Sequence, residues 1–191
     1  MNRIRAFVAI PIEEFIGNEI AKLIGKFRQP GDSIRWVAKE NLHLTLAFLG
    51  EIDAIMVPKI TEAIEGAIAE IPAFDMHVEG LGAFPNLNRP SILWVGITDG
   101  AEQVAEICEA VQAAIEPFGF PREHRKYVPH LTIGRIGKNA KNSQDLANRI
   151  EQHKDWVGGA SPVSDVVFME SELGRSGPLY SVLNTCSLGD S

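Results

Sequence analysis

The chain contains the segment His43-Leu44-Thr45-Leu46-Ala47-Phe48-Leu49-Gly50 and repeats it 87 residues later as His130-Leu131-Thr132-Ile133-Gly134-Arg135-Ile136-Gly137. Four of the eight positions are identical, and three more keep an apolar or small residue. At the same offset, Phe7-Val8-Ala9-Ile10 is similar to Trp94-Val95-Gly96-Ile97. Two matches at one offset indicate an internal duplication, with halves of about 1–86 and 87–191 within one domain.

The expected elements follow the same order, β-α-β-α-β, in both halves. Short β-branched and aromatic runs predict strands, and apolar residues at helical spacing predict helices. The first half is expected to contain strand 4–11, helix 14–28, the first repeated strand, a helix carrying Ile55 to Ile71, and strand 73–83. The second is expected to contain strand 91–98, a helix ending at Gly119, the second repeated strand, a helix carrying Leu146, Ile150 and Trp156, and strands 163–171 and 178–188.

Composition limits the class of protein further. The chain has 191 residues, of which 45% are apolar and 23% charged, as in an ordinary globular protein. No apolar run reaches the ~20 residues of a transmembrane helix, and the N-terminal apolar stretch breaks at Pro11, which argues against a secretory signal. Cys108 and Cys186 lie far apart without a CxxC motif, which is typical of a reducing compartment. We therefore expect a cytoplasmic protein.

Apolar and polar residues alternate within the repeated segment. The two-residue period of a strand places His43 and Thr45 on one face and the leucines beside them on the core face. The second copy does the same for His130 and Thr132. If the two halves pack about a pseudo-two-fold axis, both His-Thr pairs can face one site.

Two histidines and two hydroxyls suit acid–base chemistry on a phosphodiester. Imidazole titrates near 6.5, so one ring can take a proton from water while the other gives one to the leaving oxygen. Each such proton transfer typically raises the reaction rate by ~10²–10⁴-fold. The threonine hydroxyls can donate hydrogen bonds to the oxygens of the anionic phosphodiester. Two other interpretations remain: a half-buried structural histidine, and a zinc site. The repetition argues against the first. No carboxylate or thiolate stands at ligand spacing beside either histidine, so we expect no metal and no cofactor.

The paired His-x-Thr motifs resemble those of the 2H phosphoesterase superfamily. Within it, the chain is similar to the RNA 2′,3′-cyclic phosphodiesterases, also called 2′-5′ RNA ligase-like proteins. The likeness covers nearly the whole chain and includes these segments: Arg5–Ile10, Arg35–Val37, Glu40–Glu51, Phe84, Arg89–Pro90, Leu93–Trp94, Pro129–Arg135 and Ser176–Tyr180. It implies an α+β fold with two pseudo-symmetric lobes, each with an antiparallel sheet, around a central cleft. Periodicity alone leaves the strand directions open.

The resemblance also implies an activity, the metal-free opening of a 2′,3′-cyclic phosphate at an RNA end to leave a 2′-phosphate. By position, His43 would donate a proton to the 3′ leaving oxygen, and His130 would be the base that activates water. Thr45 and Thr132 would hold the phosphate. The near-symmetry of the motifs does not itself decide which histidine has which role. The expected partners are RNA ends, either tRNA-like or short oligonucleotides. We expect the protein to act on them as a monomer and to have no membrane partner.

Arg135 and Phe48 occupy the same position in the two copies and have diverged. Arg135 is similar to a cleft arginine of the family and could pair with a phosphate. Strict alternation from Thr132 turns it toward the core unless Gly134 marks a bulge or the strand's end. Phe48 suits either stacking on a base or core packing.

Further candidates for contact with RNA surround the second motif. Tyr127 and Trp94 suit either base contact or the core, which is favoured for Trp94, and His124 and Arg125 lie in a charged loop. Between Pro121 and Lys141 there are six basic residues against Glu123, a local charge of +5 within a chain of −7: Arg122, Arg125, Lys126, Arg135, Lys138 and Lys141. Such a basic patch is either a solvated loop or a binding site for one RNA end. The net negative charge of the rest of the chain disfavours an extended contact with an RNA backbone.

Two rivals to this activity remain. One is a 2H enzyme with another substrate, such as a cyclic phosphate on ADP-ribose or a 2′-5′-linked oligonucleotide, or one that runs in reverse as a 2′-5′ RNA ligase. The other is a nucleotide- or RNA-binding module without turnover, which the intact histidines and threonines disfavour.

Overall fold

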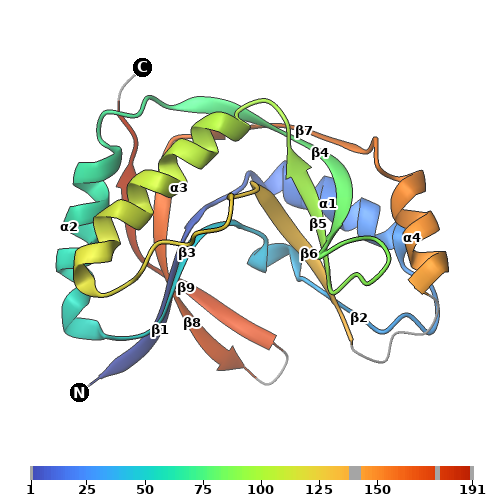
Figure 1. Ribbon diagram of the computed structural model, residues 1–191, viewed down its shortest axis with the longest axis horizontal. Helices are drawn as coiled ribbons and strands as arrows, with labels where there is room; N and C mark the ends of the chain where they lie inside the picture. Colours follow the sequence, from blue (N-terminus) through green and yellow to red (C-terminus); the bar gives the residue numbers. More distant parts are fainter. Residues whose placement is uncertain (1, 138–142, 175–176, 190–191) are drawn as a thin grey trace.

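Two antiparallel sheets and four α-helices form the part of the chain that the computed structural model describes, residues 2–137, 143–174 and 177–189 (Figure 1). The four-stranded sheet has the order β3 (Leu44–Asp53), β1 (Arg3–Ile10), β8 (Asp165–Gly174), β9 (Gly177–Ser187). The five-stranded sheet has the order β2 (Ile34–Trp36), β6 (His130–Ile136), β5 (Ile92–Ile97), β4 (Phe74–Phe84), β7 (Val157–Val163). Every pairing between these strands is antiparallel, which confirms the expected α+β class.

The helices cover the two sheets in pairs. Helices α2 (Val57–Ile68) and α3 (Ala101–Ile115) contact each other and the four-stranded sheet, whereas α1 (Glu14–Phe27) and α4 (Ser143–Gln152) contact the five-stranded sheet (Figure 1). Each helix buries an apolar face, as the periodicity predicts. No helix in the described ranges has the length and apolarity that crossing a membrane would require.

The two halves of the duplication exchange elements between the sheets. Strand β1 of the first half pairs with β3 of the same half on one side and with β8 of the second half on the other, and β8 pairs with β9. Strand β4 of the first half lies between β5 and β7 of the second. The boundary between residues 86 and 87 is therefore a boundary of the sequence repeat but does not separate the two sheets.

Four local features differ from the sequence prediction. Ile55 and Ile71, which were predicted on the second helix, lie outside α2, and Ile55 is 79% exposed. Strands β2 and β7 were not predicted, because β2 has only three residues and the Gly-Gly-Ala-Ser-Pro run of β7 has low strand propensity. The last helix ends at Gln152, so the prediction that it carries Trp156 is wrong. The chain turns first, and the Trp156 ring lies over Gly158, where a Cβ would collide with it.

The four-stranded sheet has a second, smaller apolar cluster on the face away from the main core. Along β1, Ile4, Ala6, Val8 and Ile10 belong to the main core. Phe7 and Ala9 instead join Val167, Met169 and Tyr180 on the opposite face. This face carries the first His-Thr motif, and β3 contacts β6, which carries the second.

Candidate active site

The first motif has the alternation that the sequence predicts. Leu42, Leu44 and Leu46 are each at most 7% exposed, whereas His43 and Thr45 are half-buried on the other face. Three buried leucines fix which way this strand faces, because rotating it would expose them to water. The core therefore determines the orientation of the imidazole and the hydroxyl.

The second motif repeats this arrangement on β6. Leu131 and Ile133 are buried, and His130 and Thr132 are half-buried on the opposite face. The prediction that each motif presents one histidine and one threonine on the same face is confirmed for both copies.

A β-bulge decides the orientation of Arg135. Strand β6 pairs Thr132 with Trp94 and Gly134 with Leu93, so Ile133 is the extra residue. One extra residue resets the alternation, and Arg135 returns to the face of Thr132, exposed rather than buried. Of the two alternatives for this arginine, the bulge is the one that the structure adopts.

The first copy has a bulge at the equivalent position. Strand β1 pairs Ala9 with Thr45 and Val8 with Ala47, which leaves Leu46 as the extra residue. Phe48 is consequently turned outward and is 68% exposed, so the core-packing interpretation for it is wrong. The bulge preserves the side-chain direction in both copies although the side chains have diverged.

Both histidines are held in one tautomer by the same backbone contact. His43 Nδ1 lies 2.8 Å from the carbonyl oxygen of Asn41, and His130 Nδ1 lies 2.6 Å from that of Val128. A carbonyl oxygen only accepts, so each Nδ1 carries a proton and donates it. Each Nε2 is thereby left for proton transfer, as acceptor in the neutral ring and donor in the cation.

Aromatic side chains enclose each imidazole. The His43 ring lies 4.8 Å from Phe7 and 5.3 Å from Tyr180, measured between centroids. The His130 ring lies 4.9 Å from Phe84 and 6.3 Å from Trp94. Although these segments contributed to the family resemblance, the sequence did not assign the four aromatic residues to the histidines, because they lie on other strands.

This enclosure lowers the pKa of both histidines. Burial is the largest cause for His43 and for His130, because it disfavours the imidazolium. The hydrogen bond to the backbone carbonyl opposes burial, and the charge of Arg135 lowers both pKa values further. Strands β3 and β6, which carry the two motifs, contact each other, so the charge of Arg135 reaches both rings.

The other residues predicted to contact RNA lie partly beside the motifs and partly in the exposed loop before β6. The Tyr127 hydroxyl donates to the Thr45 carbonyl oxygen at 2.7 Å, so this half-buried residue links the segment before the second motif to the strand of the first. Trp94 lies over Gly82 and Gly96 and beside His130, rather than in the main core. His124 and Arg125 are exposed in the loop before β6. Of the basic patch, Lys138 and Lys141 lie outside the described residues.

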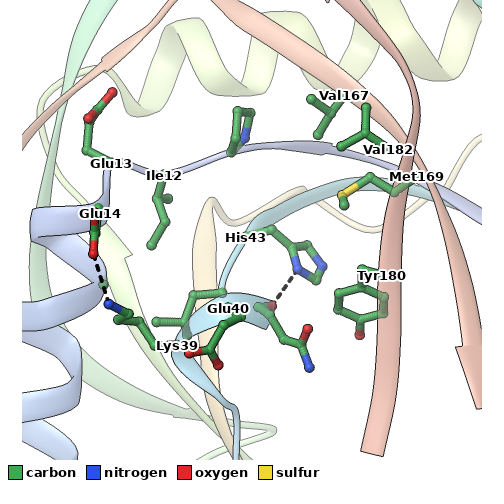
Figure 2. Close-up of a pocket in the computed structure, with 14 residues that line it drawn as sticks. Ile12, Glu13, Glu14, Lys39, Glu40, His43, Val167, Met169, Tyr180 and Val182 are labelled. Carbon is green, nitrogen blue, oxygen red and sulfur yellow. Dashed lines mark hydrogen bonds and ion pairs between the residues drawn. The ribbon is translucent and has the colours of Figure 1, made fainter. Parts of the chain in front are cut away.

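A pocket of about 470 Å³ is lined by His43 and Tyr180, among others (Figure 2). Its walls come from the chain before α1, from residues 39–43, and from β8 and β9. Ile12, Met169 and Val182 contribute apolar surface. Glu13, Glu14 and Glu40 also line it, against one lysine, Lys39, which the Glu14 carboxylate binds at 3.2 Å. These charges make the pocket unfavourable for a phosphate.

Comparison with known proteins gives the family. The sequence model of the 2′-5′ RNA ligase superfamily matches residues 16–175. The RNA 2′,3′-cyclic phosphodiesterase of Methanocaldococcus jannaschii is 37% identical over 179 residues, which cover 94% of this chain and 98% of that protein. The RNA 2′,3′-cyclic phosphodiesterase of Thermotoga maritima is 31% identical over 182 residues, covering 95% and 94%.

Solved structures show the same fold. A crystal structure from Thermus thermophilus superposes with a TM-score of 0.81 at 24% identity, covering 98% of this chain and 100% of that one. The crystal structure of E. coli LigT complexed with 3′-AMP superposes with a TM-score of 0.78 at 23% identity, covering 98% and 99%. The resemblance carried by the two His-x-Thr motifs is confirmed: this chain belongs to the 2′-5′ RNA ligase superfamily.

Proposed function

We propose that this protein is a cytoplasmic, metal-independent phosphodiesterase that hydrolyses 2′,3′-cyclic phosphates at RNA ends to 2′-phosphomonoesters. The proposal rests chiefly on one observation, that two histidines donate Nδ1–H to equivalent carbonyls and both keep Nε2 for proton transfer. The curated relatives named RNA 2′,3′-cyclic phosphodiesterase support the substrate class. RNA ends, tRNA-like or short, are the proposed partners of a monomeric enzyme.

The reaction would be an in-line attack of water on phosphorus. His130 Nε2 takes a proton from the water as its oxygen bonds to phosphorus, and the bond from phosphorus to O3′ breaks. His43 Nε2 gives its proton to O3′, which leaves as the hydroxyl, and the phosphate remains on O2′. This division of roles follows the family resemblance. The hydroxyls of Thr45 and Thr132 and the guanidinium of Arg135 stabilise the charge on the non-bridging oxygens.

Substrate binding would supply the protonated histidine. In the free protein, burial favours neutral imidazoles at both positions. An anionic phosphodiester between them favours the imidazolium, because an opposite charge stabilises the charged form. The acid is therefore charged in the complex more readily than in the free enzyme.

Turnover of a short RNA ending in a 2′,3′-cyclic phosphate tests the proposal. With EDTA present, we expect hydrolysis, and phosphorus NMR of the product should place the phosphate on O2′. The same preparation is assayed with cyclic phosphate on ADP-ribose, with 2′-5′-linked oligonucleotides, and in the ligation direction. Faster turnover in one of those assays would replace the proposed substrate. Binding without product over hours would make the protein a binding module.

Phe48 is the proposed stacking platform for the terminal base. Its exposed ring lies 6.2 Å from Phe7, whose own ring lies 4.8 Å from His43. Stacking of a base on an aromatic ring is worth ~1–3 kcal/mol, so Phe48→Ala should raise KM about tenfold and leave kcat nearly unchanged. Phe48→Trp should retain the low KM.

An abasic ribose 2′,3′-cyclic phosphate provides the control for stacking. On this substrate, wild type and Phe48→Ala should have the same kcat/KM, because no base is present to stack. An equal loss on the abasic and the natural substrate would show that Phe48 acts in some other way.

A further inference from the structure

Arg35 and Arg135 are directly opposite each other in the five-stranded sheet. Antiparallel pairing of β2 with β6 places Arg35 against Arg135, between the pairs Ile34–Ile136 and Trp36–Gly134. Directly opposed residues project from the same face, with Cβ atoms about 5 Å apart. Both arginines are exposed, and the bulge at Ile133 puts Arg135, and with it Arg35, on the face that carries Thr132.

Neither Arg35 nor Arg135 has a carboxylate partner among the residues that the structure describes. Among the described residues, no carboxylate forms an ion pair with either arginine, and neither donates a side-chain hydrogen bond. Like charges directly opposite each other on a sheet are destabilising. An anion bound between the two groups would remove that repulsion, and guanidinium is the side chain best suited to phosphate.

The two arginines stand at different distances from the reaction. Arg135 follows His130 and Thr132 on β6, and the bulge at Ile133 turns it to the face of Thr132, which is proposed to bind the reacting phosphate. Arg35 is one strand further out, on β2 at the edge of the sheet. Neighbouring strands are about 4.8 Å apart. An RNA strand that places its terminal phosphate at Arg135 can therefore reach Arg35 with its next one.

We propose that Arg35 binds the phosphodiester on the 5′ side of the terminal nucleotide, so that the enzyme prefers oligonucleotides to cyclic mononucleotides. This rests on the proposed function. The pocket beside His43 is lined by three glutamates and one lysine, and this net negative charge disfavours RNA backbone there. The surface charge thus directs the strand over the edge of the five-stranded sheet.

The test compares two dinucleotide substrates that end in a 2′,3′-cyclic phosphate. One has the natural linkage between its nucleotides and the other a neutral methylphosphonate, so the charge opposite Arg35 is removed from the substrate. For the wild-type enzyme, kcat/KM should fall about tenfold with the neutral linkage, the effect of one charge-assisted hydrogen bond. For Arg35→Ala the two substrates should be turned over at similar rates.

Matched variants separate this contact from a general effect of charge. Arg35→Lys should retain part of the preference for the natural linkage over the methylphosphonate. Arg3→Ala, which removes an exposed arginine paired with Glu51 on the other sheet, should retain all of it. The urea midpoint of Arg35→Ala should not fall, because a repulsive contact is lost.

The outcomes distinguish the inference from the function on which it rests. If Arg35→Ala discriminates between the two linkages as strongly as wild type, the inference is wrong while the proposed activity stands. If wild type turns over neither dinucleotide nor a cyclic mononucleotide, the proposed function itself fails.

Discussion

Replacement of either motif histidine is expected to reduce kcat by about 10²–10⁴-fold, the contribution of one general acid or base. His43→Asn and His130→Asn are the sharpest variants. An asparagine amide can donate to the Asn41 or Val128 carbonyl in place of Nδ1, and only the Nε2 function is lost. Single-turnover rates on a cyclic-phosphate RNA, with EDTA present, measure the effect.

His77→Ala is the matched control for the histidine variants, because this half-buried histidine on β4 takes no part in the proposed chemistry. It should have wild-type kcat. All three variants should have urea midpoints close to wild type. Turnover within threefold of wild type in either motif variant would contradict the paired-histidine mechanism.

Removal of Arg135 is expected to reduce kcat by about 10²–10³-fold and to change how both histidines titrate. The rate loss follows because, in the proposed mechanism, the charge of Arg135 stabilises the non-bridging oxygens of the transition state. In the free protein, Arg135 lowers the pKa of His43 and of His130, so both pKa values should rise toward 6.5 in Arg135→Ala. NMR titration of the two rings measures these pKa values directly. Arg135→Lys should restore most of the lost kcat and most of the lowering of both pKa values.

The direction of the pH dependence follows from the same shifts. The proposed mechanism needs one protonated ring, and kcat/KM reports the titration of the free enzyme. Because the pKa of each ring lies below 6.5, kcat/KM should be bell-shaped and already falling above pH 6.5. In Arg135→Ala the optimum should move to higher pH. A flat profile from pH 5 to 8, or histidine pKa values unchanged in the variant, would contradict this account.

The repeat and the alternation within it were sufficient to predict much of the site. Buried leucines at 42, 44 and 46 force His43 and Thr45 onto the opposite face, and this constraint is local to one strand. The alternation of a strand can therefore be predicted without knowing its neighbours. The family resemblance then added the antiparallel sheets, which periodicity does not distinguish from parallel ones.

Other features depend on register, which no single segment encodes. The orientations of Arg135 and Phe48 follow from bulges that exist only because β6 pairs with β5 and β3 with β1. The sequence contained both arginines, but only the pairing of β2 with β6 places Arg35 opposite Arg135. Side-chain direction at these positions is set by hydrogen bonding to another strand.

The sequence by itself determined the groups on which the proposed chemistry depends: two imidazoles, two hydroxyls, and the strand faces that present them. Only the tertiary structure decided which side chains surround the two histidines and in which direction their pKa values shift. It brings Phe7, Tyr180, Phe84 and Trp94 around the histidines and lowers their pKa values through burial. The physical reason is that a pKa and a counter-charge depend on everything that surrounds a group in space, and those neighbours come from strands far apart in the chain.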